Sequence, residues 1–311
     1  MQRIFLSRLM SRKSPIWLIY YGFMGLIKVF RSANNPFRTL IFLLGFFEEF
    51  ELDLRYIGKI NVSKEDIDNN FVQTLISACS NDLNCSQQTR LRSIITQRFD
   101  NIIEVDGIKI KNTMPLFILI EIFVLEDYKF HELDRGDVVI DLGASVGDSS
   151  LYLAKEGYVV YAFEPLPQIF EIGRENIKMN PQLASKINYI NKAVSCKKGV
   201  LKMGYDGVEK SHYSSLYTEK NKMVSVDTIT IDEIVSKINS KPKGLKVDCE
   251  GCEYEIMDNL DLSGFREIII EYHPQPKNRD PREIVDKLRS EGFTIKLRGN
   301  HSIGLIHARR T

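Results

Sequence analysis

The stretch that decides the fold runs Val138-Val-Ile-Asp141-Leu-Gly143-Ala-Ser145-Val-Gly147. Its first three residues form an apolar strand, and the small residues that follow predict a tight turn into a helix. Gly143 lets the chain turn sharply, and Gly147 lets the helix start close to the strand. Asp141 stands at the strand tip, where its carboxylate can accept hydrogen bonds from a cationic or hydroxyl-bearing ligand. The stretch therefore predicts a cofactor site at the end of a parallel strand.

A second acid, Glu164, ends the next apolar segment, Tyr161-Ala-Phe-Glu164-Pro165, 23 residues after Asp141. An acid at about that separation accepts hydrogen bonds from a ribose diol. The dinucleotide fingerprint would need glycines where this chain has Ser145 and Asp148, and an acid at 148 would sit badly against a pyrophosphate. The pattern therefore favours a nucleoside cofactor without phosphate groups, such as S-adenosylmethionine.

Apolar strand patterns alternate with helical patterns from Val138 onward. We expect strands at 138–140, 158–163, 187–190, 244–247 and 267–271, and helices at 149–155, 168–179, 230–238, 253–259 and from 281. This alternation predicts an α/β fold with a mostly parallel sheet and helices on both faces. Segments 293–297 and 303–308 predict a closing antiparallel hairpin. In such sheets ligands bind beyond the carboxyl ends of the strands.

The first 100 residues read as mostly helical and lack a chemical motif. We expect a strand at 52–62 and helices at 64–79 and 87–99, followed by a hairpin at 102–111 around Asp106-Gly107 and a helix at 115–128. The predicted division is therefore an N-terminal helical region over 1–100 and a cofactor domain over 101–311.

Residues 1–47 contain seven Lys or Arg and no acid, with apolar runs at 15–27 and 40–47. Each run is too short to span a bilayer. One interpretation is a helix lying on an anionic membrane, with Trp17, Tyr20, Tyr21 and Phe23 at the interface. The other is a helical arm packed on its own domain or on a second subunit.

The bulk properties narrow the partners and the compartment. A net charge of +1 gives no reason to expect nucleic acid as a partner. The five cysteines are irregularly spaced, which is not a disulfide framework. We therefore expect a cytoplasmic protein, at the inner face of the membrane if residues 1–47 bind there.

A third motif runs Leu245-Lys-Val-Asp248-Cys-Glu250-Gly-Cys-Glu253 between a predicted strand and a helix. Asp248 or Glu250 could accept the proton of a substrate hydroxyl, or hold a divalent cation that acidifies it. We assign Glu253 to the helix N-terminus, where the helix dipole favours an acid. Cys249 and Cys252 have no second pair to complete a zinc site, so we expect two small buried thiols and assign no metal.

A fourth motif, Ile268-Ile-Ile-Glu271-Tyr-His273-Pro274, ends an adjacent strand. His273 titrates near neutrality and is a candidate general base opposite Asp248. An alternative follows from Gly143-Ala-Ser145-Val-Gly147, which matches the nucleophile elbow of α/β hydrolases with Ser145, Asp248 and His273 as triad. The elbow normally follows several strands of its sheet, whereas here the sheet begins with it. A non-catalytic nucleotide-binding module is the third alternative.

Several of these pieces resemble the FkbM family of S-adenosylmethionine-dependent methyltransferases, over residues 115–295. The matching pieces are Asp141-Leu-Gly-Ala-Ser-Val-Gly-Asp-Ser, Tyr161-Ala-Phe-Glu-Pro, Asn191-Lys-Ala-Val194, Ser214-Ser-Leu, Val226-Asp-Thr-Ile and Leu245-Lys-Val-Asp-Cys-Glu-Gly-Cys-Glu. Cys249 and Cys252 depart from the family pattern, which often has small apolar residues there.

The resemblance implies the class I methyltransferase fold, which is Rossmann-like, and S-adenosylmethionine as cofactor. It implies a cofactor site formed by Asp141, Gly143, Ser145, Gly147, Glu164, Tyr128 and Ala193, with Tyr128 in a segment that closes over the cofactor. It also implies O-methylation of a sugar, glycan or small-molecule hydroxyl. We expect Asp248 or His273 to act as the base, with Glu250 and Lys246 positioning the acceptor.

Overall fold

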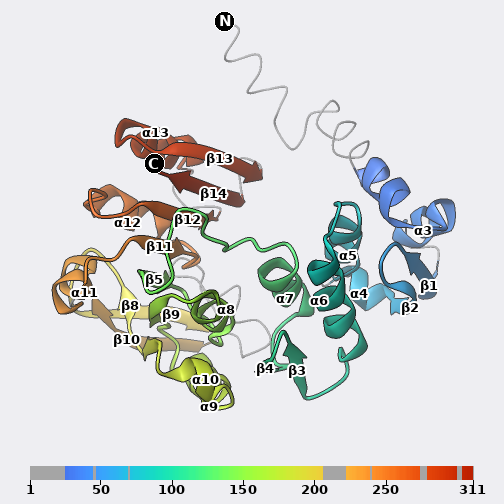
Figure 1. Ribbon diagram of the computed structural model, residues 1–311, viewed down its shortest axis with the longest axis horizontal. Coiled ribbons are helices and arrows are strands. Elements are labelled where there is room, and N and C mark those ends of the chain that lie inside the picture. Colours follow the sequence, from blue (N-terminus) through green and yellow to red (C-terminus); the bar gives the residue numbers. More distant parts are fainter. Residues whose placement is uncertain are drawn as a thin grey trace, which may run out of the picture. The chain divides into compact units, whose positions relative to one another are not determined.

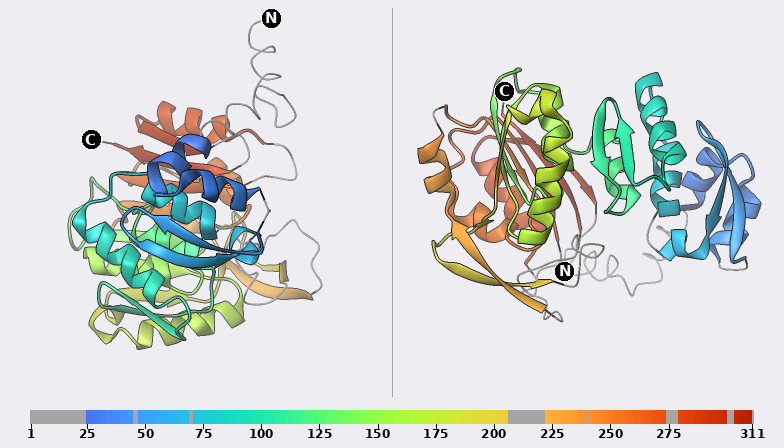
Figure 2. Two further views of the ribbon diagram at one scale, coloured as in Figure 1. Left: turned by 90° about the vertical axis from the view of Figure 1, so that its right-hand side faces the viewer. Right: turned by 90° about the horizontal axis from the view of Figure 1, so that it is seen from below.

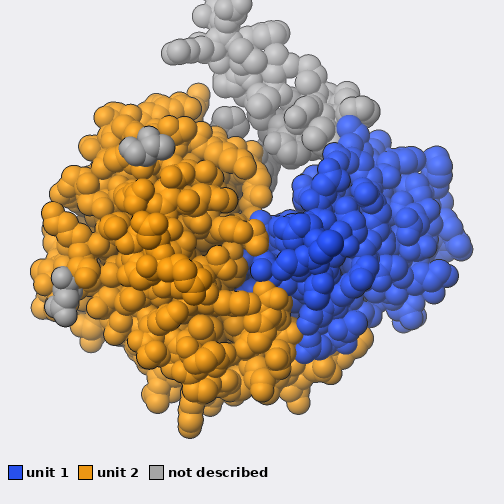
Figure 3. Space-filling model, viewed as in Figure 1, with its two compact units in different colours: residues 1–98, 115–125 blue, residues 99–114, 126–311 orange. Residues whose placement is uncertain are grey.

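The chain divides into two compact units in a computed structural model that describes residues 25–44, 47–68, 71–205, 222–238, 240–273, 279–299 and 303–310. One unit consists of Met1–Arg98 and Pro115–Leu125, and the other of Phe99–Met114 and Glu126–Thr311. Figure 3 colours the two units separately. The chain therefore passes between the units three times, after residues 98, 114 and 125.

The first unit combines helices with a two-stranded antiparallel hairpin. Residues 25–32 are helical. The elements that follow are α3 (Pro36–Leu43), β1 (Glu49–Leu54), β2 (Gly58–Ser63), α4 (Lys64–Asp68), α5 (Phe71–Cys79), α6 (Cys85–Thr96) and α7 (Leu116–Phe123). The strand predicted at 52–62 is wrong, because the chain reverses at Tyr56, whose φ is 71°, and β1 pairs with β2.

Helix α7 belongs to this first unit although it follows the β3–β4 hairpin in sequence. It packs against α5 and α6, and its buried residues are Leu119, Ile120, Ile122 and Phe123. The helix predicted at 115–128 is confirmed at its start and ends five residues early, at Phe123. The N-terminal region predicted from the sequence therefore shares its core with a later segment.

The second unit is built on a seven-stranded sheet of order β13-β14-β12-β11-β5-β6-β7 (Figure 1). Its strands are β5 (Val138–Leu142), β6 (Val159–Phe163), β7 (Ile187–Ile190), β11 (Gly244–Val247), β12 (Glu267–Tyr272), β13 (Thr294–Gly299) and β14 (Gly304–Arg309). Strands β12, β11, β5, β6 and β7 pair in parallel, whereas β14 pairs antiparallel with β12 and β13. The predicted α/β fold with a closing antiparallel hairpin is confirmed.

Helices cover both faces of this sheet. They are α8 (Asp148–Glu156), α9 (Pro167–Lys178), α10 (Pro181–Ala184), α11 (Ile231–Lys237), α12 (Glu253–Asn259) and α13 (Pro281–Ser290). Parallel crossovers are right-handed, so the helices that follow β5 and β6 lie on one face and α12, which follows β11, on the other. In the right-hand view of Figure 2 the yellow-green helices and the orange helices lie on opposite sides of the strands.

Two smaller sheets complete the second unit. The predicted hairpin is confirmed as β3 (Ile102–Val105) and β4 (Ile108–Lys111). A three-stranded sheet of β8 (Ala193–Val194), β9 (Val200–Tyr205) and β10 (Lys222–Ile229) was not predicted. The buried residues Val226 and Thr228 lie two apart in β10, and this alternation is the signal that could have identified a strand.

Strand register brings the predicted motifs to one edge of the large sheet. Asp141 on β5 lies opposite Lys246 on β11, and Val247 lies opposite Ile270 on β12. Asp248 and Glu271 are the next residues of their strands and emerge together at the carboxyl ends. The interior beneath them is apolar, with Ile140, Val247 and Ile270 fully buried.

Several sequence predictions fall outside the described residues. They concern Trp17, Tyr20, Tyr21 and Phe23 of the proposed membrane segment, and the Ser214-Ser-Leu motif. Among the residues described, no helix combines the length and the apolar composition that crossing a bilayer requires.

Candidate active site

The glycine turn after β5 has a positive φ at every second residue. Gly143, Ser145 and Gly147 have φ values of 75°, 46° and 79°. A Cβ atom on Gly143 would lie 1.7 Å from the carbonyl oxygen of Asp248. Both the left-handed conformation and this close approach therefore require glycine at 143. Glycine at position 143 therefore allows the turn after β5 to pack directly against the loop after β11.

Glu164 ties this turn to the end of β6. Its carboxylate accepts hydrogen bonds from the amides of Ser145 at 3.1 Å and Leu166 at 2.8 Å. Only 6% of the residue is exposed, and burial raises the pKa of Glu164 to about 8. The carboxyl group therefore stands where the sequence predicted a ribose acceptor, with acceptor capacity left on each oxygen.

Asp141 and Lys246 form a buried ion pair beneath the turn. Lys246 Nζ lies 3.2 Å from Asp141 Oδ1 and donates a hydrogen bond to the Gly143 carbonyl at 2.8 Å. The hydroxyls of Ser149 and Ser150 donate to Asp141 Oδ2 at 2.8 and 2.7 Å. Lys246 is 1% exposed, and the acceptor-positioning role predicted for it stays a prediction. The pair holds the glycine turn in place.

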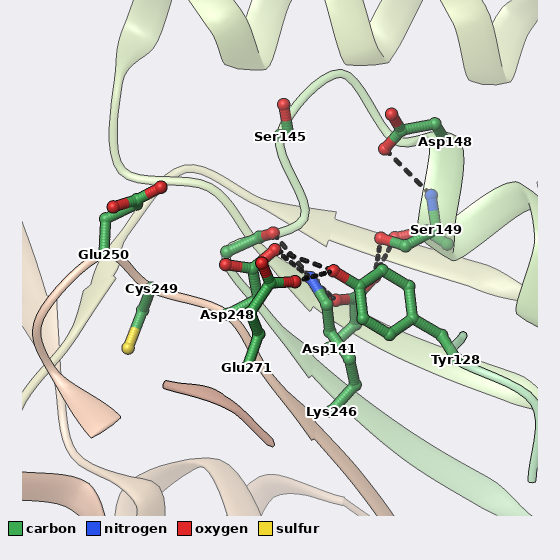
Figure 4. Close-up of polar contacts among 12 residues, drawn as sticks. Tyr128, Asp141, Ser145, Asp148, Ser149, Lys246, Asp248, Cys249, Glu250 and Glu271 are labelled. Carbon is green, nitrogen blue, oxygen red and sulfur yellow. Dashed lines mark hydrogen bonds and ion pairs between the residues drawn. The ribbon is translucent and has the colours of Figure 1, made fainter. Parts of the chain in front are cut away.

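The carboxyl ends of β11 and β12 carry the acidic part of the site (Figure 4). The Tyr128 hydroxyl lies 3.0 Å from Asp248 Oδ2 and 2.8 Å from Glu271 Oε2. His273 Nε2 lies 3.9 Å from Asp248 Oδ1, 3.5 Å from Glu250 Oε1 and 3.7 Å from Glu271 Oε1. The structure therefore brings the three predicted catalytic residues together and adds Tyr128 and Glu271 to them.

The crowding of these groups shifts their proton affinities. Burial, and next the charge of Glu271, raise the pKa of Asp248 to about 6. Burial raises the pKa of Glu250 to about 8. For His273 burial lowers the pKa, but hydrogen bonds with Glu253 and Glu271 outweigh it and raise the pKa to about 12. At neutral pH the imidazole is therefore a cation next to the ionised Asp248 and the protonated Glu250.

Asp248, Glu271 and His273 offer three ligand atoms within 4.8 Å of one another. Two carboxylates and an imidazole are ligands that divalent cations accept. A metal ion bound here would have to displace the proton from His273, because only the neutral imidazole is a ligand.

A small pocket opens beside the glycine turn. Its walls include Gly143, Phe163, Pro165, Ala193 and Met203. Apart from the glycine these side chains are apolar, and Lys192 also lines the pocket. Ala193 therefore lies at the pocket, and Glu164 follows directly after Phe163 at the end of β6. The cofactor role that the resemblance implies for both residues stays a prediction.

Two cysteines of the pocket wall are joined, contrary to the prediction of free thiols. Cys249 and Cys252 form a disulfide with their Cα atoms 5.5 Å apart. The turn through Glu250 and Gly251, whose φ values are 52° and 125°, brings the two side chains within bonding distance. Sequence spacing alone could not reveal this turn. The disulfide encloses Glu250 and so restrains the acidic loop.

The hydrolase triad is not assembled. The described contacts of Ser145 run through its backbone, to Glu164 and to the Tyr189 hydroxyl. Figure 4 shows its side chain directed away from Asp248 and Glu271. His273 meets Asp248, Glu250, Glu253 and Glu271, and none of its described contacts reaches Ser145.

Three further residues shape the site. Glu253 begins α12, which confirms its assignment to a helix N-terminus, and it is also fully buried and bonded to His273, which the sequence did not reveal. Asn191 donates from its side chain to the carbonyls of Glu164 and Pro165 and so fixes the end of β6. Asp148 caps Ser149 through Oδ1, and within the described chain its buried Oδ2 has no hydrogen-bond partner.

Comparisons with known proteins agree with this geometry. Residues 141–295 match the family model of the methyltransferase FkbM domain. "Methyltransferase sdnD" of Sordaria araneosa is 25% identical over 175 residues, which are 56% of this chain and 62% of the relative. "31-O-demethyl-FK506 methyltransferase FkbM" of Streptomyces tacrolimicus is 25% identical over 238 residues, covering 63% of this chain and 90% of the relative. The chain thus spans less than two thirds of the Sordaria protein.

A solved methyltransferase FkbM from Methylobacillus flagellatus KT superposes with a TM-score of 0.41 and 14% identity, over 78% of this chain and 60% of that one. The family match covers the turn after β5, Glu164, the acidic loop and His273. The chain therefore belongs to the FkbM family of S-adenosylmethionine-dependent methyltransferases.

Proposed function

We propose that this chain transfers the methyl group of S-adenosylmethionine to a hydroxyl oxygen of a sugar, glycan or other small molecule. The observation that carries the proposal is the group of carboxylates Asp248, Glu250 and Glu271, held beside the glycine turn. A hydroxyl is a poor nucleophile at neutral pH, so its methylation requires a nearby base. The name of the Streptomyces relative also refers to methylation at oxygen.

The residues around the turn suit this cofactor. The apolar pocket beside Gly143 and Ala193 would hold the adenine ring, and the carboxyl group of Glu164 would accept the ribose hydroxyls. Asp148 has a buried carboxylate oxygen without a partner in the described chain, which suits a donor group and opposes a phosphate. When bound, S-adenosylmethionine supplies an electrophilic methyl group on a sulfonium.

The remaining chemistry belongs to the protein's own side chains. We assign the base to Asp248, because a pKa of about 6 leaves its carboxylate free to take a proton at neutral pH. The charged ring of His273 has no free electron pair, and Glu250, with a pKa of about 8, keeps its own proton and would position the acceptor. Asp141, Ser145 and Gly147 shape the cofactor turn without touching the acceptor. Tyr128 orients Asp248 and Glu271 through its hydroxyl. Alignment of the acceptor oxygen with the methyl group then contributes most of the rate.

An acceptor screen tests this function. The chain would be incubated with S-adenosylmethionine labelled in its methyl group and with panels of methyl glycosides, oligosaccharides, phenols and amines. We expect label in a methyl ether, at least a 100-fold slower transfer for Asp248→Asn, which is the range that general bases contribute, and slower transfer for Glu250→Gln as well. Label found only on amines, or two variants as fast as wild type, would rule out the assignment.

We further propose that residues 26–47 contact an anionic membrane surface, which would place the enzyme at the inner face of a membrane. Leu26 and Phe30 project from the first described helix, and Phe37, Ile41 and Leu44 from the next. They repeat at helical spacing, while Val29, Thr39 and Phe42 on the other side are buried.

The exposed apolar residues form one surface, because the rings of Phe30 and Phe37 lie 5.2 Å apart, edge to face. Their exposed fractions are 49% and 70%. Residues 1–47 contain seven Lys or Arg and no acid, so the net charge of this segment complements anionic lipid. A basic segment with an apolar helical face is typical of peripheral membrane binding.

Vesicle flotation tests this contact. We expect the full chain to float with vesicles of phosphatidylcholine and phosphatidylglycerol but less with phosphatidylcholine alone. Phe37→Ser with Leu44→Ser should reduce binding at least tenfold, since each removes an exposed apolar side chain worth about 1–2 kcal/mol of burial. Phe99→Ser, which alters an 85% exposed ring elsewhere, should bind as wild type. Equal flotation of all three proteins would contradict the contact.

A further inference from the structure

Glu253, the first residue of α12, is a fully buried carboxylate next to the acidic loop. Burying a carboxylate is costly unless it has a partner. Its Oε1 lies 2.9 Å from His273 Nδ1 and accepts a hydrogen bond from the Gly251 amide at 3.2 Å. By contrast Glu255, two residues on, serves structure alone by bonding Ser195 and Cys196. Glu253 is therefore directed at the imidazole.

The bond at Nδ1 determines what the other ring nitrogen faces. An imidazole ring is rigid, so a partner that holds Nδ1 also fixes the direction of Nε2. In this orientation Nε2 points toward oxygens of Asp248, Glu250 and Glu271, at 3.5 to 3.9 Å. A ring flip would replace Nε2 with a carbon atom and leave the three carboxyl groups without a facing N–H donor.

We propose that Glu253 is a positioning residue for methyl transfer: it holds the His273 ring so that Nε2–H faces the three carboxylates that meet the acceptor. The proposal rests on the function proposed above, because that function places the acceptor hydroxyl at Asp248 and Glu250. Glu253 itself does not touch the acceptor, since it has no exposed surface.

The charges around the imidazole of His273 explain why its orientation must be fixed. Three carboxylates surround one nitrogen, and only one further described cation, Lys246, lies within 4 Å of any of them, at Asp248. The charges of Asp248 and Glu271 repel each other at this distance unless a cation stays between them. The hydrogen bond to Glu253 is among the causes that raise the pKa of His273 and so keep the ring charged.

Glu267 provides a matched control. It lies at the opposite end of β12, is also fully buried, and accepts hydrogen bonds from the amides of His131 and Glu132. Glu267→Gln therefore reports what loss of a buried carboxylate does to stability, far along the strand from His273.

The first arm of the test uses nuclear magnetic resonance of the full chain with ¹⁵N-labelled histidine, assigned with His273→Gln. We expect a protected Nδ1 proton on His273 in the wild type. Glu253→Gln should retain this proton with a shifted resonance, because a neutral oxygen replaces a charged one. Glu253→Leu should lose it, and Glu267→Gln should leave it unchanged. An unshifted resonance in Glu253→Gln overturns the proposal, even if Glu253→Leu does not fold.

The second arm uses the acceptor that the screen identifies. Removal of the partner that orients a metal-ligating histidine costs about 10–100-fold, and we expect a similar range for the imidazole of His273, which is held in the same way. We expect Glu253→Leu to lower kcat by that factor with the acceptor KM and the cofactor Kd within about threefold of wild type, and Glu253→Gln to recover most of it. An equal loss in Glu267→Gln would assign the effect to stability and overturn the proposal. If no acceptor is found, the proposed function fails while the first arm still decides the role of Glu253.

Discussion

Glu164 is an almost fully buried carboxyl group that accepts hydrogen bonds from two backbone amides. Its raised pKa makes the stability of the protein depend on pH. Burial raises its pKa to about 8 in the native state, from 4.5. A native state that keeps a proton which the unfolded chain releases is stabilised at low pH, and this stabilisation is lost as pH rises through the native pKa.

Titration of Glu164 should therefore lower the free energy of unfolding as pH rises from about 4.5 to about 8. The side chain of Glu164→Gln cannot titrate. The stability of this variant relative to wild type should therefore increase across this interval and stay constant above it. Urea unfolding at pH 5, 6, 7 and 8 measures the difference. Glu175→Gln, at an exposed position, is the control. A wild-type-to-variant difference that stays constant with pH would contradict the assignment of Glu164.

At the residue scale the sequence predicted positions better than roles. Asp141, Glu164 and Asp248 were identified because acids at strand ends are unusual, and all three lie at the site. The burial of Lys246 could not be predicted, because it depends on the register that sets Lys246 opposite Asp141. The role of Glu253 was missed for a similar reason, since its partner His273 lies 20 residues away on another strand.

At the scale of elements, the glycine turn is the part most tightly specified. Gly143 and Gly107 have nearly the same φ, 75° and 76°, but a Cβ on Gly107 would meet nothing within 4 Å. Comparing substitutions at these two glycines therefore separates the cost of backbone strain from the cost of steric contact.

Gly107→Ala should cost about 1–2 kcal/mol, which is the strain of a left-handed residue. Gly143→Ala should cost about 4 kcal/mol or more, because the loop after β11 must also move. Denaturant unfolding of the two variants checks this. Equal losses in the two variants would show that the turn and the acidic loop are not in contact.

The disulfide between Cys249 and Cys252 makes a second prediction at this scale. Unfolded protein without reductant should present three free thiols, Cys79, Cys85 and Cys196, rather than five. Replacing both bonded cysteines by serine should lower stability by about 2 kcal/mol, the loop-closure value for so short a ring. Cys85→Ser, at an exposed free thiol, should have no such effect. Five reactive thiols would restore the original prediction of free cysteines.

Elements were predicted from sequence with uneven success, for identifiable reasons. Strands β5, β6, β11 and β12 have apolar runs bounded by turn residues, so their positions were predicted closely. Helix α13 was predicted from Asp280 and Glu283, which form the expected capping box. Strands β9 and β10 were missed because their pattern is mixed and the partner of each is separated from it by a long segment.

At the scale of the whole molecule, the chain returns to its first unit after entering the second. Helix α7 has four buried apolar residues, and it packs against α5 and α6 of the same unit. A division at residue 100, as the sequence suggested, would separate α7 from these partners.

A chain of residues 99–311 should therefore aggregate, because α7 would expose Leu119, Ile120 and Phe123. Light scattering against the full chain measures this, and Ile120→Gln with Phe123→Gln should restore solubility to the shorter chain. A monodisperse 99–311 chain without these substitutions would instead support the boundary predicted from sequence.

Calorimetric titration of S-adenosylmethionine into the full chain measures whether the turn after β5 and Glu164 bind this cofactor. We predict one site of micromolar affinity, weakened about 10–100-fold in Glu164→Ala by the loss of two hydrogen bonds worth about 1 kcal/mol each, and unchanged in Glu175→Ala. No binding to the wild-type chain, or equal affinity in a folded Glu164→Ala variant, would show that these residues do not form the cofactor site.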